Sequence, residues 1–452
     1  KTQESEVGDG TTTAVMIAGK LLENAERLLD QKIHPTVIAK GYRMAAEKSQ
    51  EILKSIALRI TPEDEDVLKQ IAMTAMTGKS AEDAKENFAE IIVQAVKQIQ
   101  NDKGIDLNDI KIEKSKGDGI KDTELIAGIV LDKEKVSQDM PSVVENARIS
   151  LIDFPLEIKN PEIDTKISIS SPDQLRSFIE QEELSIKQMV EKVRFSGANV
   201  IFCQKGIDDF AQYLLAKAGI YACRRVAKSD MEKLAKATRA KIVSNLNELS
   251  SSELGNAQKV EEVKHGEDTL TYVRGCKNPR ALTILIHGGT GHVIDEIERA
   301  IKDGLGDVIA SLKYGLVVAG GGAVEIELAR KLREFGNSLS GREQLAVEEF
   351  ANALEYIPAT LAENAGMDPI DVLTELKSKH DSGEKNAGLN LFTNKVENML
   401  EARILEPLKI KTQAISSASE VAIMILRIDD VIASSGRNRS KMKMPSGMGE
   451  YD

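Results

Sequence analysis

The part of this sequence best suited to chemistry is a glycine-flanked aspartate followed by three threonines, Gly8-Asp9-Gly10-Thr11-Thr12-Thr13. The glycines let the backbone approach a ligand closely, and the threonines stand where apolar residues begin to recur at helical spacing. A helix N-terminus offers unpaired N–H groups and a partial positive charge, so it attracts phosphate. Asp9 repels phosphate directly, but a Mg²⁺ ion placed between them would bind both. The motif therefore indicates nucleotide binding.

A structural alternative exists for the same residues. An Asp-Gly turn that leads into a Thr-capped helix has this sequence too, and such turns are common. A second Gly-Asp-Gly, at residues 117–119, has no apolar helix behind it, and we predict that it is only a turn. For the first motif, the residues alone leave both interpretations open.

Five regions of different character follow one another along the 452 residues. The sequence predicts helices starting at Thr11 and Pro35, then further helices with a strand-and-loop region, then strands alternating with helices, then a strand, a helix and a strand, and finally a mostly helical stretch. The approximate bounds of these regions are 11–60, 61–130, 131–283, 284–319 and 320–432. This nested order predicts that the α/β middle is inserted into flanking segments whose halves meet in space.

Composition restricts the classes of function. The formal net charge is −12 and no long basic run occurs, so we expect no nucleic acid as a principal partner. No apolar stretch reaches membrane-spanning length and the first residues do not form a signal peptide, so we expect no membrane partner and a soluble, cytoplasmic protein. The three cysteines and five histidines lack the spacing of a metal site, and we interpret them as structural.

Six motifs spread over nearly the whole chain occur in the order typical of one family. They are Val7–Val15 (VGDGTTTAV), Gln31–Pro35 (QKIHP), Ser170–Gln174 (SSPDQ), Cys203–Asp209 (CQKGIDD), Val318–Ala323 (VAGGGA) and Ala362–Pro369 (AENAGMDP). Together they resemble the group II chaperonins of the archaeal thermosome type, in the TCP-1/cpn60 chaperonin family. The resemblance implies an ATP-driven folding machine of two stacked rings with roughly eight or nine subunits each. Its implied cofactors are ATP and Mg²⁺, and its implied partners are identical or paralogous subunits and unfolded client proteins.

The resemblance also implies a multidomain chaperonin fold. A mainly helical equatorial domain would comprise residues 1–61 and 320–452, and a small α/β intermediate domain would comprise residues 62–130 and 284–319. An α/β apical domain would span residues 131–283. Within it, a helical protrusion at about 160–200 would serve as a built-in lid.

Site residues follow from the same resemblance, one position at a time. Asp9 matches the Mg²⁺ ligand of the family, and Gly10, Thr11, Thr12 and Thr13 match its phosphate contacts.

Asp303 matches the aspartate that orients the attacking water. In-line attack on a γ-phosphate needs a carboxylate that aligns this water while Mg²⁺ offsets the developing charge. From the residues alone Asp303 is one acid on a charged helix, with Asp307 a nearby rival, and only the family alignment selects it.

Further residues are implied to surround the nucleotide. Gly321 would let the backbone pack against it, although a tight strand-to-helix turn also needs glycine. Asn390 and Glu406 would line the base and the ribose, and Ile404 would form an apolar wall for the adenine. Lys79 resembles a loop lysine that senses the γ-phosphate from the intermediate domain. Taken alone, each of these polar residues would be interpreted as surface or helix-end sequence.

The expected lid contains a helix with a clear start. Ser171 is predicted to cap it and Pro172 to occupy its first position. Apolar residues recur on one stripe, namely Leu175, Phe178, Ile179, Ile186, Met189, Val190 and Val193. An exposed stripe could bind unfolded chains or neighbouring lids. An ordinary core-facing helix remains the alternative, so no client-binding residue is assigned.

Two other classes of function stay open. A small-molecule kinase or ligase would share a phosphate loop, but no Walker A pattern or kinase motif set occurs. A non-catalytic ring or scaffold protein is the third class. The N-terminal phosphate loop of the family has no counterpart before Lys1, and because the sequence starts within what looks like a helix, we expect this segment to precede it in the native protein.

Overall fold

A computed structural model describes residues 3, 7–78, 84–100, 104–117, 119–158, 171–265 and 268–428. Its helices are α2 (Thr11–Asp30), α3 (Pro35–Ile56), α4 (Glu65–Met76), α5 (Lys85–Ile99), α6 (Pro172–Ser196), α7 (Asp209–Lys217), α8 (Lys228–Thr238), α9 (Gly291–Tyr314), α10 (Ala323–Asn337), α11 (Glu343–Asn364), α12 (Pro369–Asp381) and α13 (Leu408–Ile425). Both helix starts predicted for the first region, at Thr11 and Pro35, are confirmed.

The strands form separate small sheets. They are β1 (Leu58–Arg59), β2 (Ile110–Lys116), β3 (Glu124–Ile126), β4 (Ile129–Leu131), β5 (Val143–Ile152), β6 (Val200–Cys203), β7 (Tyr221–Cys223), β8 (Ile242–Val243), β9 (Gly255–His265), β10 (Asp268–Arg274), β11 (Leu282–Gly288), β12 (Leu316–Ala319), β13 (Ala387–Asn390), β14 (Lys395–Asn398) and β15 (Leu405–Pro407). Their orders are β1-β12-β15, β2-β11-β3, β13-β14 and β4-β10-β9-β5-β6-β7, with β8 paired to β5.

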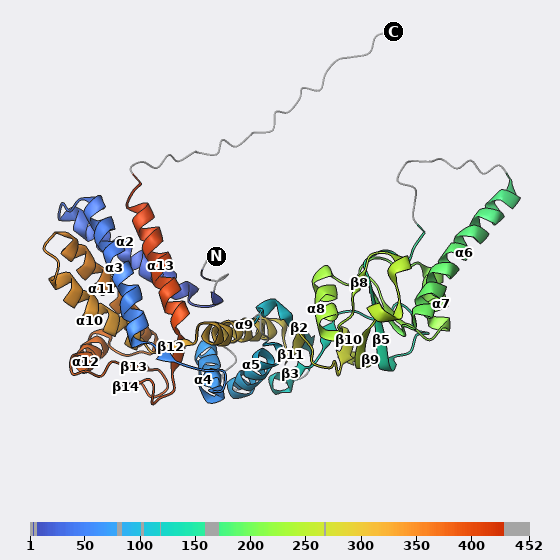
Figure 1. Ribbon diagram of the computed structural model, residues 1–452. Coiled ribbons are helices and arrows are strands. Elements are labelled where there is room, and N and C mark those ends of the chain that lie inside the picture. Colours follow the sequence, from blue (N-terminus) through green and yellow to red (C-terminus); the bar gives the residue numbers. More distant parts are fainter. Residues whose placement is uncertain are drawn as a thin grey trace, which may run out of the picture.

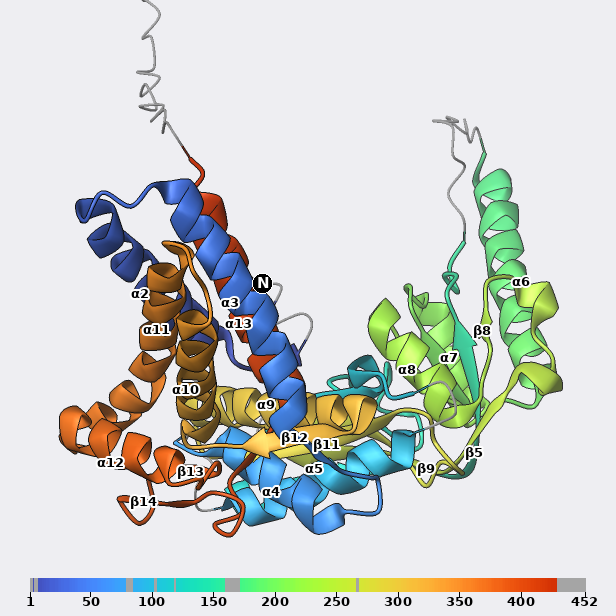
Figure 2. The same ribbon diagram turned by 60° about the vertical axis from the view of Figure 1, so that its left-hand side comes forward.

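The molecule is extended, with three bodies in a row (Figure 1). Helices α2, α3, α10, α11 and α13 lie at one end, and helices α6, α7 and α8 lie with the largest sheet at the other. Between them lie α4, α5 and α9 with the sheet of β2, β11 and β3. The turned view shows the same order and shows α6 projecting away from the far body (Figure 2).

The first body has a helical core built from both ends of the chain. Buried residues of α2 and α3 pack with buried residues of α10, α11 and α13. Within it, the Tyr42 and Phe350 rings meet edge-on with centroids 5.8 Å apart, a favourable aromatic geometry. The Tyr42 hydroxyl donates to the Leu21 carbonyl at 2.7 Å, which satisfies its buried polar group.

The central body also joins two distant segments. Strand β11 pairs in parallel with β2, so that Ile284 lies beside Ile112, and α4, α5 and α9 cover this sheet with apolar side chains. Helix α9 approaches its neighbours closely at Gly304, where an added Cβ would lie 2.8 Å from the Ile92 side chain. Glycine at this position therefore lets α9 pack tightly.

The far body is the α/β region, and its sheet differs from the expected alternation. Strands β5, β6 and β7 run parallel with helices between them, which agrees with the predicted alternation of strands and helices, although β7 itself was not predicted. The sequence analysis missed the long antiparallel hairpin of β9 and β10, which extends the sheet on its other side. Half-buried and exposed charged residues occupy much of β9, so this strand lacks a continuous apolar signal.

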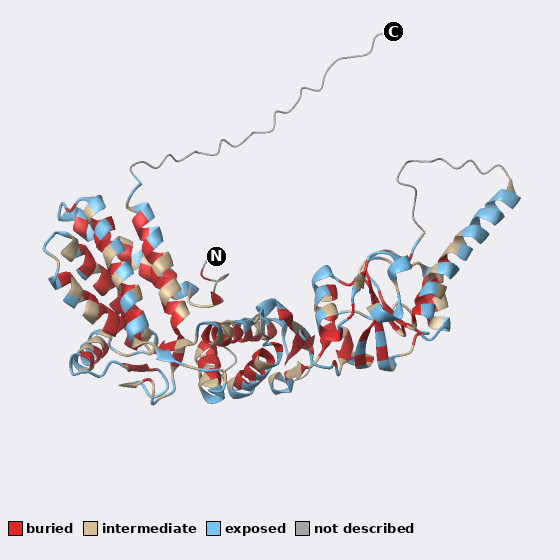
Figure 3. Cartoon of the chain, in the orientation of Figure 1, coloured by how far each residue is buried: buried red, intermediate tan, exposed pale blue. Residues whose placement is uncertain are grey.

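Helix α6 begins as predicted but is only half buried. The Ser171 hydroxyl accepts a hydrogen bond from the Gln174 amide, and Pro172 is the first helical residue. The lower part of the apolar stripe is buried, whereas Leu175, Phe178 and Ile179 are exposed. Figure 3 shows this outer part as mostly exposed. The rest of the expected protrusion, residues 160–170, lies outside the described residues.

The last region is less helical than predicted. Strands β13, β14 and β15 interrupt it between α12 and α13. Each has only three or four residues, too few for a pattern of alternating hydrophobicity to appear. Residues 429–452 are not described. None of the described helices is long and apolar enough to cross a membrane.

Candidate nucleotide site

The glycine-flanked aspartate lies in a loop that opens α2. Gly10 is the N-cap of this helix with φ 77°, and Gly8 has φ 82°, so both occupy a left-handed conformation that glycine adopts without strain. The interpretation of a Thr-capped helix is therefore wrong. Because the cap residue has no side chain, the first turn is open, and the exposed Thr11 and Thr12 begin it.

Helices α9 and α13 hold this loop in place. A Cβ on Gly306 of α9 would lie 2.9 Å from the Val7 carbonyl oxygen, and a Cβ on Gly10 would lie 2.7 Å from the Ile410 side chain. Val7 and Ile410 share a small apolar cluster with Ala310. The loop is thus fixed by close packing of three segments that are far apart in sequence.

Asp303 lies on α9, one turn before the contact with the loop. It is half buried and, with Gly8, lines a cleft of about 850 Å³ that continues along α9 and β2. Asp307 lies one turn further along α9 and is buried, with 2% of its surface exposed. Only Asp303 of the two lines this cleft, which favours it for contact with a ligand.

A run of three glycines joins β12 to α10 and packs against β13. Gly321 has φ 60°, and a Cβ there would lie 2.6 Å from the Leu389 carbonyl oxygen and 2.7 Å from the Met399 sulfur. The Leu389 amide donates to the Gly321 carbonyl at 2.8 Å. Only glycine fits this position, which confirms the tight strand-to-helix turn, whereas the packing of Gly321 against a nucleotide stays a prediction.

The structure places Asn390, Ile404 and Glu406 around this glycine run. Asn390 ends β13 and is buried, and its side-chain oxygen accepts from the Phe392 amide at 2.9 Å. The Ile404 carbonyl accepts from the Gly320 amide at 2.9 Å. A Cβ on Gly320 would lie 3.0 Å from Glu406 Oε1. The structure therefore brings together these residues, which are distant in sequence.

Electrostatics couple the glycine run to the Asp9 loop. Burial is the main reason that the pKa of Glu406 is raised, and the negative charge of Asp9 adds to the effect. Lys411 forms ion pairs with Glu406 and with Glu325 of α10. Burial opposes the charge of Lys411, but the two carboxylates outweigh it and raise the pKa of this lysine. The sequence did not lead us to Lys411 and Glu325. A lysine among the apolar residues of α13 was the available signal, because a buried lysine needs an acidic partner.

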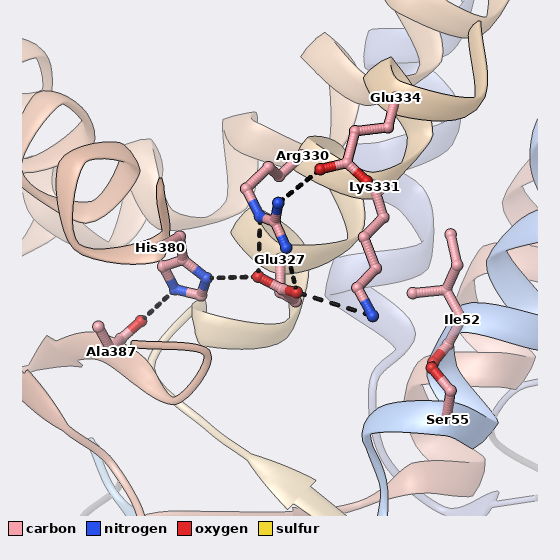
Figure 4. A network of polar contacts seen from close by, with 8 residues as sticks. All are labelled: Ile52, Ser55, Glu327, Arg330, Lys331, Glu334, His380 and Ala387. Atoms are coloured by element: carbon pink, nitrogen blue, oxygen red, sulfur yellow. Dashed lines mark hydrogen bonds and ion pairs between the residues drawn. The ribbon is translucent and has the colours of Figure 1, made fainter. Parts of the chain in front are cut away.

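A second buried polar network connects β13 to α10 and α12 (Figure 4). His380 of α12 lies 3.0 Å from Glu327 of α10 through Nδ1 and 2.8 Å from the Ala387 carbonyl through Nε2. Both ring nitrogens face acceptors, and Arg330 holds Glu327 as a carboxylate through two hydrogen bonds. The His380 side chain thereby ties α10, α12 and β13 together.

A Mg²⁺ ion at this site would have Asp9 as its predicted protein ligand. In the parts of the chain described above, no group of three or more His, Cys, Asp or Glu side chains is arranged to hold a metal. An ion held by one protein carboxylate takes its other ligands from nucleotide phosphates and water, which is usual for Mg²⁺. Lys79 lies outside the described residues, so its position stays a prediction.

Known proteins resemble this chain over nearly its whole length. A sequence model of the TCP-1/cpn60 chaperonin family matches residues 1–435. The thermosome subunit of Methanopyrus kandleri is 58% identical over 437 residues, which cover 96% of this chain and 80% of that relative. Thermosome subunit beta of Archaeoglobus fulgidus is 58% identical over 445 residues, or 98% and 82% of the two chains.

A solved structure agrees with these relatives. The open-state monomer of a group II chaperonin from Methanococcoides burtonii is 48% identical to this chain, with a TM-score of 0.68. The match covers 93% of this chain and 100% of that one. The predicted multidomain fold is thereby confirmed.

Proposed function

Because the chain belongs to the TCP-1/cpn60 chaperonin family, we propose that it is an ATP-dependent group II chaperonin subunit that encloses and folds unfolded proteins. The observation that carries this proposal is the arrangement around α13: Ile410 of this helix packs against the Asp9 loop, and Glu406 just before it lies beside the triple-glycine turn. Asp303 and Gly8 of the same loop line one cleft. These are the parts that phosphoryl transfer needs: a metal carboxylate, an open helix N-terminus and an acid beside the cleft.

The proposed domains are those stated above for the equatorial, intermediate and apical parts. Three groups of apolar cores support this division. One combines residues 17–57 with 316–426, the second combines residues 60–125 with 282–312, and a third group lies within residues 129–281. Smaller apolar clusters, such as Val7, Ala310 and Ile410, bridge neighbouring bodies, so a movement of one body relative to another would have to rearrange these contacts while each main core stays folded.

The proposed chemistry assigns one role to each residue. Asp9 would hold Mg²⁺, which supplies positive charge that stabilises the transferring phosphoryl group. Gly10 and the three threonines after it would bind phosphate oxygens at the open turn of α2. Asp303 would orient the attacking water from the cleft. Asn390, Ile404 and Glu406 would hold the base and ribose over Gly321.

Proposed partners are identical or paralogous subunits in a double ring and unfolded client proteins, and the proposed location is the cytoplasm. The outer part of α6 supports the lid assignment, since its large apolar side chains are exposed in the part of the chain that the structure describes. Lys79 is proposed to sense the γ-phosphate from the intermediate domain. A cation that contacts nucleotide only in the ATP state would bias domain closure.

The test is ATP hydrolysis by the purified, size-defined assembly. It should be measured with Mg²⁺ or with a chelator, and with or without a denatured client protein. We expect Mg²⁺-dependent turnover by a large ring that the client alters. Turnover by a monomer that ignores the client would favour a small-molecule enzyme, and absence of both nucleotide binding and turnover would favour a scaffold.

A further inference from the structure

A buried ion-pair cluster beside the proposed nucleotide residues is centred on Lys411. Its Nζ lies 2.6 Å from Glu406 Oε2 and 2.8 Å from Glu325 Oε1. The side chains of Lys411 and Glu325 are 8% and 3% exposed, whereas that of Glu406 is 23% exposed. Lys411 therefore joins an interior carboxylate to one that reaches the surface of the site.

The charges explain why a lysine is needed there. Two carboxylates meet at this point, and the charge of Asp9 also acts on Glu406. Without a cation, the buried carboxylate of Glu325 and the partly exposed carboxylate of Glu406 would repel each other with no opposite charge between them, which is unfavourable. One ammonium group can donate to both carboxylates at once, since it carries three hydrogens.

The ion pair also fixes the direction of Glu406. One of its oxygens is bound to Lys411, so the other, Oε1, is directed to the glycine run, 3.0 Å from the place of a Gly320 Cβ. Strand β15 adds to this order, because Glu406 pairs with Val318 of β12. The carboxylate thus has one oxygen committed to the protein and one available at the site.

We propose that Lys411 is a positioning residue for the nucleotide, holding Glu406 so that its free oxygen accepts a hydrogen bond from a ribose hydroxyl. This inference rests on the function proposed above, because that function assigns Glu406 to the ribose. Lys411 itself does not touch the nucleotide. Its effect is specific to the sugar and leaves the contacts to phosphate and base unchanged.

The test uses the full chain and calorimetric titration with ADP and with dideoxyADP, which lacks both ribose hydroxyls. The key variant is Lys411→Met/Glu325→Gln, which removes one cation and one anion and so keeps the net charge of the cluster. Glu406→Gln serves as the direct comparison. Lys409→Met, on the same helix, is the matched control.

The wild-type protein and Lys409→Met are expected to prefer ADP about tenfold or more, the size of a hydrogen bond to a charged group. The double variant should lose most of this preference and keep its affinity for dideoxyADP. A general structural defect would instead weaken both ligands. If the double variant does not assemble, Lys411→Arg decides, because a planar guanidinium cannot reproduce this geometry and should reduce the preference several-fold.

Two outcomes would overturn the inference, and they differ in whether the assignment of Glu406 to the ribose survives. Undiminished ADP preference in the lysine variants, with loss of that preference in Glu406→Gln, would leave the proposed function intact and remove only the role of Lys411. Lack of any ADP preference in the wild-type protein would remove the assignment of Glu406 as well.

Discussion

Asp303 and Asp307 lie one turn apart on α9, and their surroundings separate them. Asp303 lines the cleft beside Gly8, whereas Asp307 is buried. From the sequence, spacing alone could not choose between them, because both stand on a helix rich in charged residues. The burial of Asp307 distinguishes the two residues, since a carboxylate that orients the attacking water must reach the cleft.

We predict that Asp303→Ala keeps ATP binding and assembly but loses hydrolysis, by about a hundredfold or more, because its carboxylate acts on the attacking water and not on the bound ground state. Steady-state turnover and equilibrium ATP titration measure the two effects separately. Asp307→Asn is the matched comparison on the same helix. Normal turnover in Asp303→Ala, or loss of hydrolysis only in Asp307→Asn, would remove the assignment.

A second prediction concerns pH and Glu327. Burial alone would raise the pKa of Glu327, but hydrogen bonds from Arg330 and His380 outweigh it and lower this pKa. A carboxylate with a lowered folded-state pKa adds stability above its unfolded pKa of about 4.3, and this stability is lost as pH falls through the folded value. Acid should therefore reduce the free energy of unfolding below about pH 4.3.

Denaturant unfolding across this range provides the measurement. Glu327→Gln should cost about 3 to 5 kcal/mol at neutral pH, because it breaks a buried pair, and should flatten the acid dependence. Glu334→Gln is the control: it also pairs with Arg330, but its side chain is 63% exposed, so we expect a change below about 1 kcal/mol. Equal effects of the two substitutions would show that burial of Glu327 is not the cause.

At the scale of elements, α6 has two halves with different roles. Ile186 and Val190 are buried in a core of the α/β body, whereas Leu175 and Phe178 are 46% and 38% exposed. In the sequence the apolar stripe is interrupted by Glu182 and Glu183, which suits a face that is only partly buried. Periodicity shows which face is apolar but not which part of it another element covers.

We predict opposite effects of substitution in these halves. Ile186→Ala should destabilise the protein by about 2 to 5 kcal/mol, as expected for a cavity in a core. Phe178→Ser should change stability by less than about 0.5 kcal/mol but weaken the binding of an unfolded client. Unfolding curves and client co-sedimentation give the two readouts. A Phe178→Ser variant that unfolds as easily as Ile186→Ala would contradict the division.

The elements differ in how far the sequence could predict them. Long helices with caps, such as α3 with Pro35 at its start, carried a strong local signal. Strands β13 to β15 did not, because their three or four residues are held by contacts to distant glycines. The candidate site shows the same limit. The family resemblance pointed to Gly321 and Glu406, whereas Lys411 and His380 could be recognised only from their contacts with residues that are distant in sequence.

At the scale of the whole molecule, small apolar clusters join the three bodies in the row. The central body takes one half of its core from residues 60–125 and the other from residues 282–312. Asp303 lies on α9 of this body, while the glycine run and the Asp9 loop adjoin the first body. A nucleotide bound between them would contact both, so its hydrolysis could change their relative position.

The most direct measurement of the central claim is the refolding yield of a chemically denatured client enzyme in the presence of the assembled protein. We predict a higher yield with ATP and Mg²⁺ than with ADP or a chelator, and no such gain with assembled Asp303→Ala. A yield that does not depend on ATP would contradict the account.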